Sequence, residues 1–188
     1  MKKLFLFFVI FLFSNVSIAM AQDTKETMTT ENKTEPTMIV RYDLAYPGLL
    51  PDNPLYKLKI LRDKMTASLI NDPKKKIYFY LLQADKGILA AAMLIDKNKI
   101  ELAKETALKA ENNFTLLTQQ FGRLTKKPDS NFFQKLRTAS KKHQEVIRSL
   151  MQRVSSDQKK TFEDILYFSQ VNLKSVGKYE KHIQEDEY

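Results

Sequence analysis

The chain has 188 residues and a formal net charge of +9, with 31 lysines and arginines against 22 aspartates and glutamates. It contains no cysteine, which excludes disulfides and cysteine nucleophiles. Four glycines and no tryptophan suit helices better than sheets. So few glycines also argue strongly against a glycine-rich phosphate-binding loop.

The first 21 residues have the three parts of a secretory signal peptide. Lys2 and Lys3 form a basic start, residues 4–13 are continuously apolar, and residues 19–21 match an A-x-A cleavage site. The apolar run is about half the length needed to span a bilayer, so we expect cleavage after Ala21 rather than a retained anchor. The chain is therefore predicted to be exported and to be periplasmic, extracellular or associated with the cell envelope.

The mature chain is expected to begin with a polar spacer over residues 22–45, most of it disordered. Residues 22–38 are rich in threonine, glutamate and lysine and lack apolar periodicity. Within the spacer, residues 39–44 are predicted to form a short extended segment that packs on the domain. We place the folded domain at residues 46–184 and an acidic tail at residues 185–188.

The sequence next shows start signals for two successive helices. Prolines and a glycine in residues 47–51 exclude regular helix there, and Asp52 or Asn53 then offers a cap, with Pro54 in the first turn. Residues 71–73 (NDP) repeat the signal. Between the two starts, one apolar stripe at helical spacing is formed by Leu55, Leu58, Leu61, Met65 and Leu69.

The second helix, predicted at about residues 73–95, is apolar over most of its circumference. One face carries Ile77, Tyr80, Leu81, Ala84, Ile88, Ala91 and Ile95, and another carries Leu82, Leu89 and Met93. A helix of this kind is usually buried. We therefore predict that it is the central helix, with the others packed on it.

The residues around these two helix starts resemble those of a known family. The stretch LLPDNPLYKLK (49–59), the stretch DPKKK (72–76) and the Leu/Ala-rich run to Ala92 resemble domain-of-unknown-function family 5667. Its members share a similar opening and a similar second helix start, and they are exported or membrane-tethered bacterial proteins. The resemblance covers residues 49–121 and implies a helical fold and an extracytoplasmic location. It implies no activity, cofactor or catalytic residue.

Three more helices are predicted at about residues 99–124, 131–154 and 157–183. Alanines at the start of the first of these would let it approach the preceding helix closely. Asp129 or Ser130 caps the next helix, and Ser155 and Gln158 have capping-box spacing before the last. The predicted fold class is all-α: an antiparallel bundle of four to five helices after a cleaved signal peptide and a disordered spacer.

Candidate catalytic and metal-binding residues are few. The two histidines, His143 and His182, do not form an HExxH pair, and no serine lies in a nucleophile elbow. His143 falls on an apolar helix face, so we interpret it as a hydrogen-bonded core histidine with Glu180 as its candidate partner. We expect no catalytic site, no metal and no cofactor, and we infer no small-molecule substrate.

Positive charge concentrates between residues 123 and 160, where eleven basic residues face three acids. The candidate anion-binding face consists of Lys126, Lys127, Lys135, Arg137, Lys141, Lys142, Arg148 and Arg153. Such a face attracts anionic envelope polymers or a membrane surface without sequence specificity, and no specific nucleic-acid binding is expected. A solvated face that only aids solubility is the competing interpretation.

The leading functional hypothesis is an exported, non-catalytic binding or structural module of the bacterial cell envelope. The alternative is an extracytoplasmic chaperone or stress-response adaptor that binds peptide segments on an apolar groove. A third hypothesis is an enzyme whose residues are dispersed along the chain. The partner stays unknown at this stage: a protein, an anionic polymer or a membrane surface.

Overall fold

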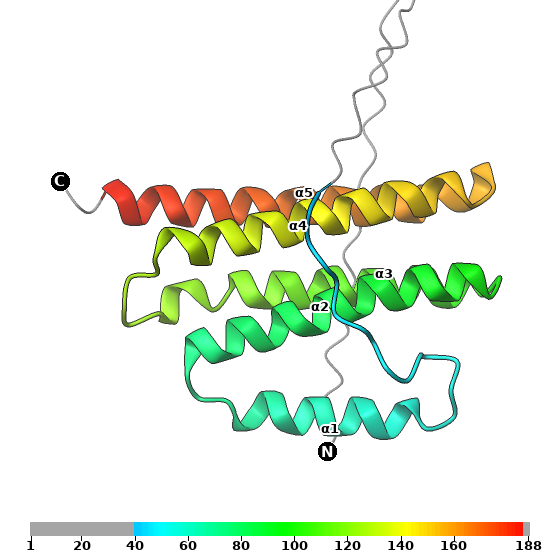
Figure 1. The fold of residues 1–188 in the computed structure, drawn as a ribbon, viewed down its shortest axis with the longest axis horizontal. Helices are drawn as coiled ribbons and strands as arrows, with labels where there is room; N and C mark the ends of the chain where they lie inside the picture. The colour runs from blue at the N-terminus through cyan, green and yellow to red at the C-terminus, as the bar shows by residue number, and fades with distance from the viewer. Residues whose placement is uncertain (1–39, 186–188) are drawn as a thin grey trace, which may run out of the picture. The chain divides into compact units, whose positions relative to one another are not determined.

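The computed structural model describes residues 40–185, so the predicted signal peptide and most of the predicted spacer lie outside the described residues. The described part contains five α-helices and a short 3-10 helix and no strand, which confirms the all-α class (Figure 1). The elements are α1 (Tyr56–Leu69), α2 (Pro73–Asp96), α3 (Ile100–Thr118), η1 (Phe121–Arg123), α4 (Ser130–Gln152) and α5 (Ser156–Glu185).

Four of the helices close a ring. The contacts run from α2 to α3, from α3 to α5, from α5 to α4 and from α4 back to α2. The prediction that every helix packs on α2 was therefore wrong, because in this ring α2 and α5 are diagonal. Each helix has two neighbours, and the second apolar face of α2 is only partly covered: Leu82 stays 40% exposed. Among the described helices, α2 alone has the length and apolar composition of a bilayer-crossing helix, which is weak evidence because much of its apolar face is bundle core.

The bundle has two apolar clusters separated along its length. One contains Ile77, Phe114, Leu136 and Val176, and the other contains Ile88, Ala107, Ile147 and Ile165. On every helix of the ring, a buried polar residue lies between the positions that belong to the two clusters. We call this set of residues the polar layer: Asp85 on α2, Glu111 on α3, His143 on α4 and Asn172 on α5.

The starts of α2 and α4 follow the sequence signals, whereas α1 begins at Tyr56 with Leu55, not the predicted Asp52 or Asn53, at its N-cap position. The carboxylate of Asp72 accepts a hydrogen bond from the Lys75 amide at 2.8 Å, and that of Asp129 accepts one from the Phe132 amide at 2.8 Å. The third helix, predicted to reach residue 124, ends at Thr118 instead. There the Thr118 hydroxyl donates to the Thr115 carbonyl at 2.8 Å, and the chain tightens into the 3-10 helix.

The segment before α1 crosses the helices as a strap, with contacts first to α4 and then to α2 (Figure 1). The amide of Val40 donates to the Glu145 carboxylate on α4 at 2.8 Å. Tyr42 packs on the first apolar cluster and Leu44 on the second, which confirms that this stretch packs on the domain. Farther on, the carboxylate of Asp52 lies within 3.0 Å of two lysines in the α2–α3 turn.

Helix α1 lies outside the ring. It has no buried residue, and its contacts with the ring are sparse. The predicted apolar stripe faces away from the bundle, with Leu58 64% and Leu69 77% exposed. Periodicity correctly located the apolar face of this helix, but the ring of four helices leaves no place to bury it.

Helices α2 and α3 approach each other closely at Gly87, as the alanines of α3 predicted. A β-carbon added at Gly87 would lie 2.6 Å from the β-carbon of Ala110, which no pair of real side chains tolerates. Gly177 on α5 offers the opposite case, because a β-carbon there would meet nothing within 4 Å.

We predict that Gly87→Ala destabilises the protein although alanine favours helices. The clash with Ala110 must push two packed helices apart, which costs roughly 1–3 kcal/mol. Gly177→Ala is the matched control and should stabilise by about 1 kcal/mol through helix propensity alone. Urea unfolding of both variants tests this, and equal stabilisation by the two substitutions would contradict the close packing of α2 on α3.

Candidate functional site

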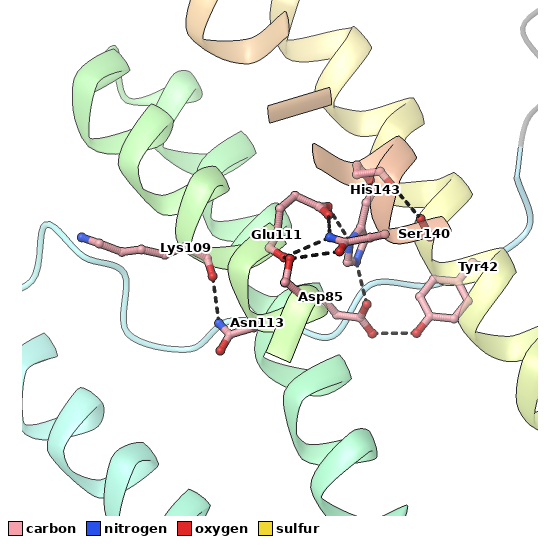
Figure 2. A network of polar contacts seen from close by, with 10 residues as sticks. Tyr42, Asp85, Lys109, Glu111, Asn113, Ser140 and His143 are labelled. Atoms are coloured by element: carbon pink, nitrogen blue, oxygen red, sulfur yellow. Dashed lines mark hydrogen bonds and ion pairs between the residues drawn. The ribbon is translucent and has the colours of Figure 1, made fainter. Parts of the chain in front are cut away.

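The polar layer is organised around the imidazole ring of His143 (Figure 2). Its Nδ1 lies 3.0 Å from Oε1 of Glu111, and its Nε2 lies 2.9 Å from Oδ1 of Asp85. The ring also makes a T-shaped contact with Phe114, with 5.7 Å between the ring centroids. The histidine is therefore clamped between two carboxylates that come from two different helices.

The second oxygen of each carboxylate also has a donor. The Tyr42 hydroxyl donates to Oδ2 of Asp85 at 2.7 Å, so the strap before α1 is tied to the layer (Figure 2). The side-chain amide of Asn172 donates to Oε2 of Glu111 at 3.0 Å. Asn172 is held in turn by the Thr115 hydroxyl, which donates to its carbonyl oxygen at 3.0 Å. All four carboxylate oxygens are thus hydrogen-bonded in the interior.

The geometry favours the doubly protonated form of His143, the imidazolium. An ionised carboxylate can only accept, and each ring nitrogen of His143 faces a carboxylate to which it can donate a proton. Burial by itself lowers the pKa of His143, but the hydrogen bonds and charges of Asp85 and Glu111 outweigh it and raise the pKa to about 9. Burial and the adjacent carboxylate of Asp85 likewise raise the pKa of the Tyr42 hydroxyl far above its usual value.

The arrangement leaves His143 no free ring nitrogen for acid or base catalysis. A general base needs a free lone pair within reach of a substrate, and both ring nitrogens of His143 are occupied in a side chain that is fully buried. Beside Asp85 an open hollow of about 350 Å³ is also lined by Tyr42, Tyr78 and Lys135. In residues 40–185, no group of three or more histidines, cysteines or acids is placed to hold a metal ion.

The prediction that His143 is a hydrogen-bonded core residue is confirmed, but its predicted partner was wrong. Glu180 forms an ion pair with Arg137 instead. The true partners, Asp85 and Glu111, were missed because helical acids are usually solvated. Helical periodicity could have identified them as core residues. Each acid lies four residues after one buried residue of its helix and three residues before another.

The structure neutralises part of the predicted anion-binding face. Arg137 pairs with Glu180, Lys142 with Glu145 at 2.6 Å, and Arg153 with Asp96, while the ammonium of Lys135 lies 5.1 Å from the Tyr78 ring centroid. The remaining members are exposed side chains: Lys126, Lys127, Lys141 and Arg148. Anion binding by this face stays a prediction.

A groove lies between α1 and the pair formed by α2 and α3. Its volume is about 520 Å³. The inner face of α1 supplies Ile60 and Ala67, and α2 supplies Phe79 and Tyr80. The α3 wall is mixed, with the apolar Leu102 and Leu116 and the amides of Asn112 and Asn113. The amide of Asn113 donates to the Lys109 carbonyl at 3.0 Å (Figure 2).

The chain matches one family model over more than half of its length. The model described as a domain of unknown function (DUF5667) matches residues 48–157. The chain belongs to the DUF5667 family. No curated protein and no solved structure shows a significant match to it.

The DUF5667 match divides the polar layer and Tyr42, which is hydrogen-bonded to it. Asp85, Glu111 and His143 lie within the matched residues, whereas Tyr42 and Asn172 lie outside them. The matched range also ends at the start of α5, which completes the ring. The imidazolium clamp is thus part of the DUF5667 region, and the groups that saturate its outer oxygens come from the flanking chain.

We predict that His143 makes the DUF5667 domain less stable at alkaline pH. The folded pKa of about 9 lies above the unfolded value of about 6.5, so the contribution is complete below pH 6.5 and is lost as the pH rises through 9. The free energy of unfolding should fall by roughly 3 kcal/mol across this window.

The variant His143→Gln should remove this slope and lower the stability at neutral pH by roughly 3 kcal/mol, because it breaks a buried ion pair. His182→Gln, outside the polar layer, is the matched control and should keep the wild-type slope. Urea unfolding at a series of pH values measures both. Stoichiometric zinc held by the wild type and lost in His143→Gln would contradict the structural role of this histidine.

Proposed function

We propose that this protein is an exported, non-catalytic binding module of the bacterial cell envelope. The observation that carries the proposal is the contrast between its interior and its α1 side. The converging ionisable groups are buried and mutually saturated, whereas an apolar groove and an exposed apolar helix face lie open beside them. The saturated layer leaves no free lone pair on His143 for general-base chemistry, whereas the α1 side offers surface for binding.

Export is supported by the first 21 residues, which have the basic, apolar and cleavage regions of a secretory leader. The absence of cysteine is compatible with either side of the membrane, because the bundle is held by packing and by the polar layer. The groups that tie the strap to the ring, Tyr42 and Glu145, come after the leader and belong to the mature chain.

The groove favours a second, more specific function, the holding of peptide segments. Its aromatic and aliphatic walls suit apolar side chains of a bound segment. The exposed amide of Asn112, with Asn113 and Gln83, offers donors and acceptors of the kind that pair with a peptide backbone. An extended or helical segment lying between α1 and α2–α3 would contact both.

The first prediction of the proposal concerns the N-terminus. Expressed in a bacterium with its own leader, the protein recovered from the envelope should begin at Gln22, because the leader is removed after Ala21. Intact-mass measurement tests this directly. A recovered mass that still includes Met1 would show that the N-terminal segment is retained and would contradict a cleaved leader.

The second prediction concerns the groove. If it holds peptide segments, the protein should slow the aggregation of reduced insulin followed by light scattering. Ala67→Arg places a long charged side chain in the groove and should weaken this protection at least severalfold. Thr66→Arg adds the same charge on the exposed side of α1 and is the matched control. Protection that is absent in the wild type, or equal in the two variants, would rule out peptide holding by the groove.

A further inference from the structure

Exposed apolar side chains are concentrated in one short part of the chain. Of the twelve large apolar residues that are exposed between residues 40 and 185, seven lie in residues 46–69. They are Tyr46, Leu49, Leu55, Leu58, Leu61, Met65 and Leu69. Scattered single residues of this kind need no explanation, but a contiguous group marks an interaction site.

The group is contiguous in space. Leu58, Leu61, Met65 and Leu69 form a ridge along the outer side of α1 at helical spacing, opposite the inner face that lines the groove. At the start of the helix the ridge continues into an open hollow of about 460 Å³, whose walls include Tyr46, Leu49, Leu55 and Leu58. We call this surface the α1 ridge. It is convex along the helix, so it does not enclose a ligand.

Basic residues outnumber acids around the α1 ridge. Lys57 and Lys64 lie on one flank, and Arg62, with 66% of its side chain exposed, lies within the ridge. Lys59 and Lys86 line the hollow at its start. The single acid of α1, Asp63, is turned inward and is ion-paired with Lys59 and Arg62.

We infer that the α1 ridge docks on the surface of an anionic lipid bilayer. This names the partner of the binding module and so rests on the proposed function. A helix with an apolar side and flanking lysines and arginines lies in the bilayer interface, where its apolar side enters the acyl boundary and its cations meet anionic headgroups. Long basic side chains such as Arg62 can extend from the apolar side to the headgroups.

The same charges argue against the other occupants of the ridge. A second copy of the chain would bring a basic surface against an identical basic surface, and α1 has no exposed acid to compensate. A peptide needs a concave site, which the convex part of the ridge does not offer. The groove lies on the other face of α1, and the hollow at the start of the ridge is open and lined by Lys59, Arg62 and Lys86. An extended anionic plane fits both the convex shape and the sign of the charge.

The test uses the exported form of the protein, recovered from the envelope, and co-sedimentation with vesicles. Vesicles of phosphatidylcholine with phosphatidylglycerol should bind the protein, and vesicles of phosphatidylcholine alone should bind it much more weakly. Replacing Leu58, Leu61 and Met65 by serine should weaken binding by roughly tenfold or more, because three apolar side chains no longer enter the bilayer. The matched control replaces the exposed Leu82, Leu108 and Val171 by serine and should bind like the wild type.

A second pair of variants tests the charge. Replacing Lys57, Arg62 and Lys64 by glutamine should weaken binding and reduce its dependence on salt. The same change at Lys126, Lys141 and Arg148 of the predicted α4 face is the control and should have little effect. Equal binding to both kinds of vesicle, or loss of binding only in the α4 variant, would overturn the inference.

The remaining outcomes separate this inference from the proposed function. A dimer in sedimentation velocity that disappears in the Leu58, Leu61 and Met65 variant would assign the ridge to a second copy and overturn membrane docking. If no vesicles are bound while Ala67→Arg still abolishes insulin protection, only the membrane inference fails. If the protein is not exported but binds vesicles through α1, the proposed function fails and the ridge inference stands.

Discussion

The ion triplet of Asp85, His143 and Glu111 is the constraint on which the bundle depends. Each helix of the ring contributes one residue to the polar layer, and each contact joins two different helices. A shift of α2, α3 or α4 by one turn would leave a buried carboxylate or the imidazolium without its counter-charge, at a cost of about 3–5 kcal/mol, comparable to much of a small domain's stability. A shift of α5 would remove the amide of Asn172 that donates to Glu111. Apolar clusters tolerate many packings, whereas this layer accepts one alignment. We therefore regard it as the element that fixes the register of α2, α3, α4 and α5.

The same layer connects the strap to the ring. Tyr42 donates to the carboxylate that clamps His143, so the chain entering the domain is anchored at the centre of the bundle rather than at its end. The strap then leads to α1, which the closed ring leaves outside. The two features are related. The four helices of the ring bury their main apolar faces against two neighbours each, and the fifth helix, α1, lies beside the outer surface of α2 and α3. The groove and the exposed ridge are consequences of this topology.

How far the sequence predicts the structure differs between features. Local signals located the starts of α2 and α4, because Asp72 and Asp129 each cap a backbone amide only three residues later in the chain. The end of α3 was missed because side-chain hydrogen bonds and the η1 turn compete with a pattern that continues in sequence. The burial of His143 followed from periodicity, but its partners come from two other helices and needed the register of the bundle. For α1, periodicity gives the direction of the apolar face but not whether the fold has a partner for it.

Helix α1 contributes little to the stability of the ring, and this bears on its role. It has no buried residue, and its first turn has no side-chain cap. A helix of 14 residues is marginal in water when packing does not support it. A partner that covers the ridge would therefore stabilise the helix as well as bind it, so order in α1 and occupancy of the ridge are thermodynamically linked. The ring, complete through its polar layer, does not need the apolar residues of α1. Their free energy of burial is gained only when something outside the bundle covers them.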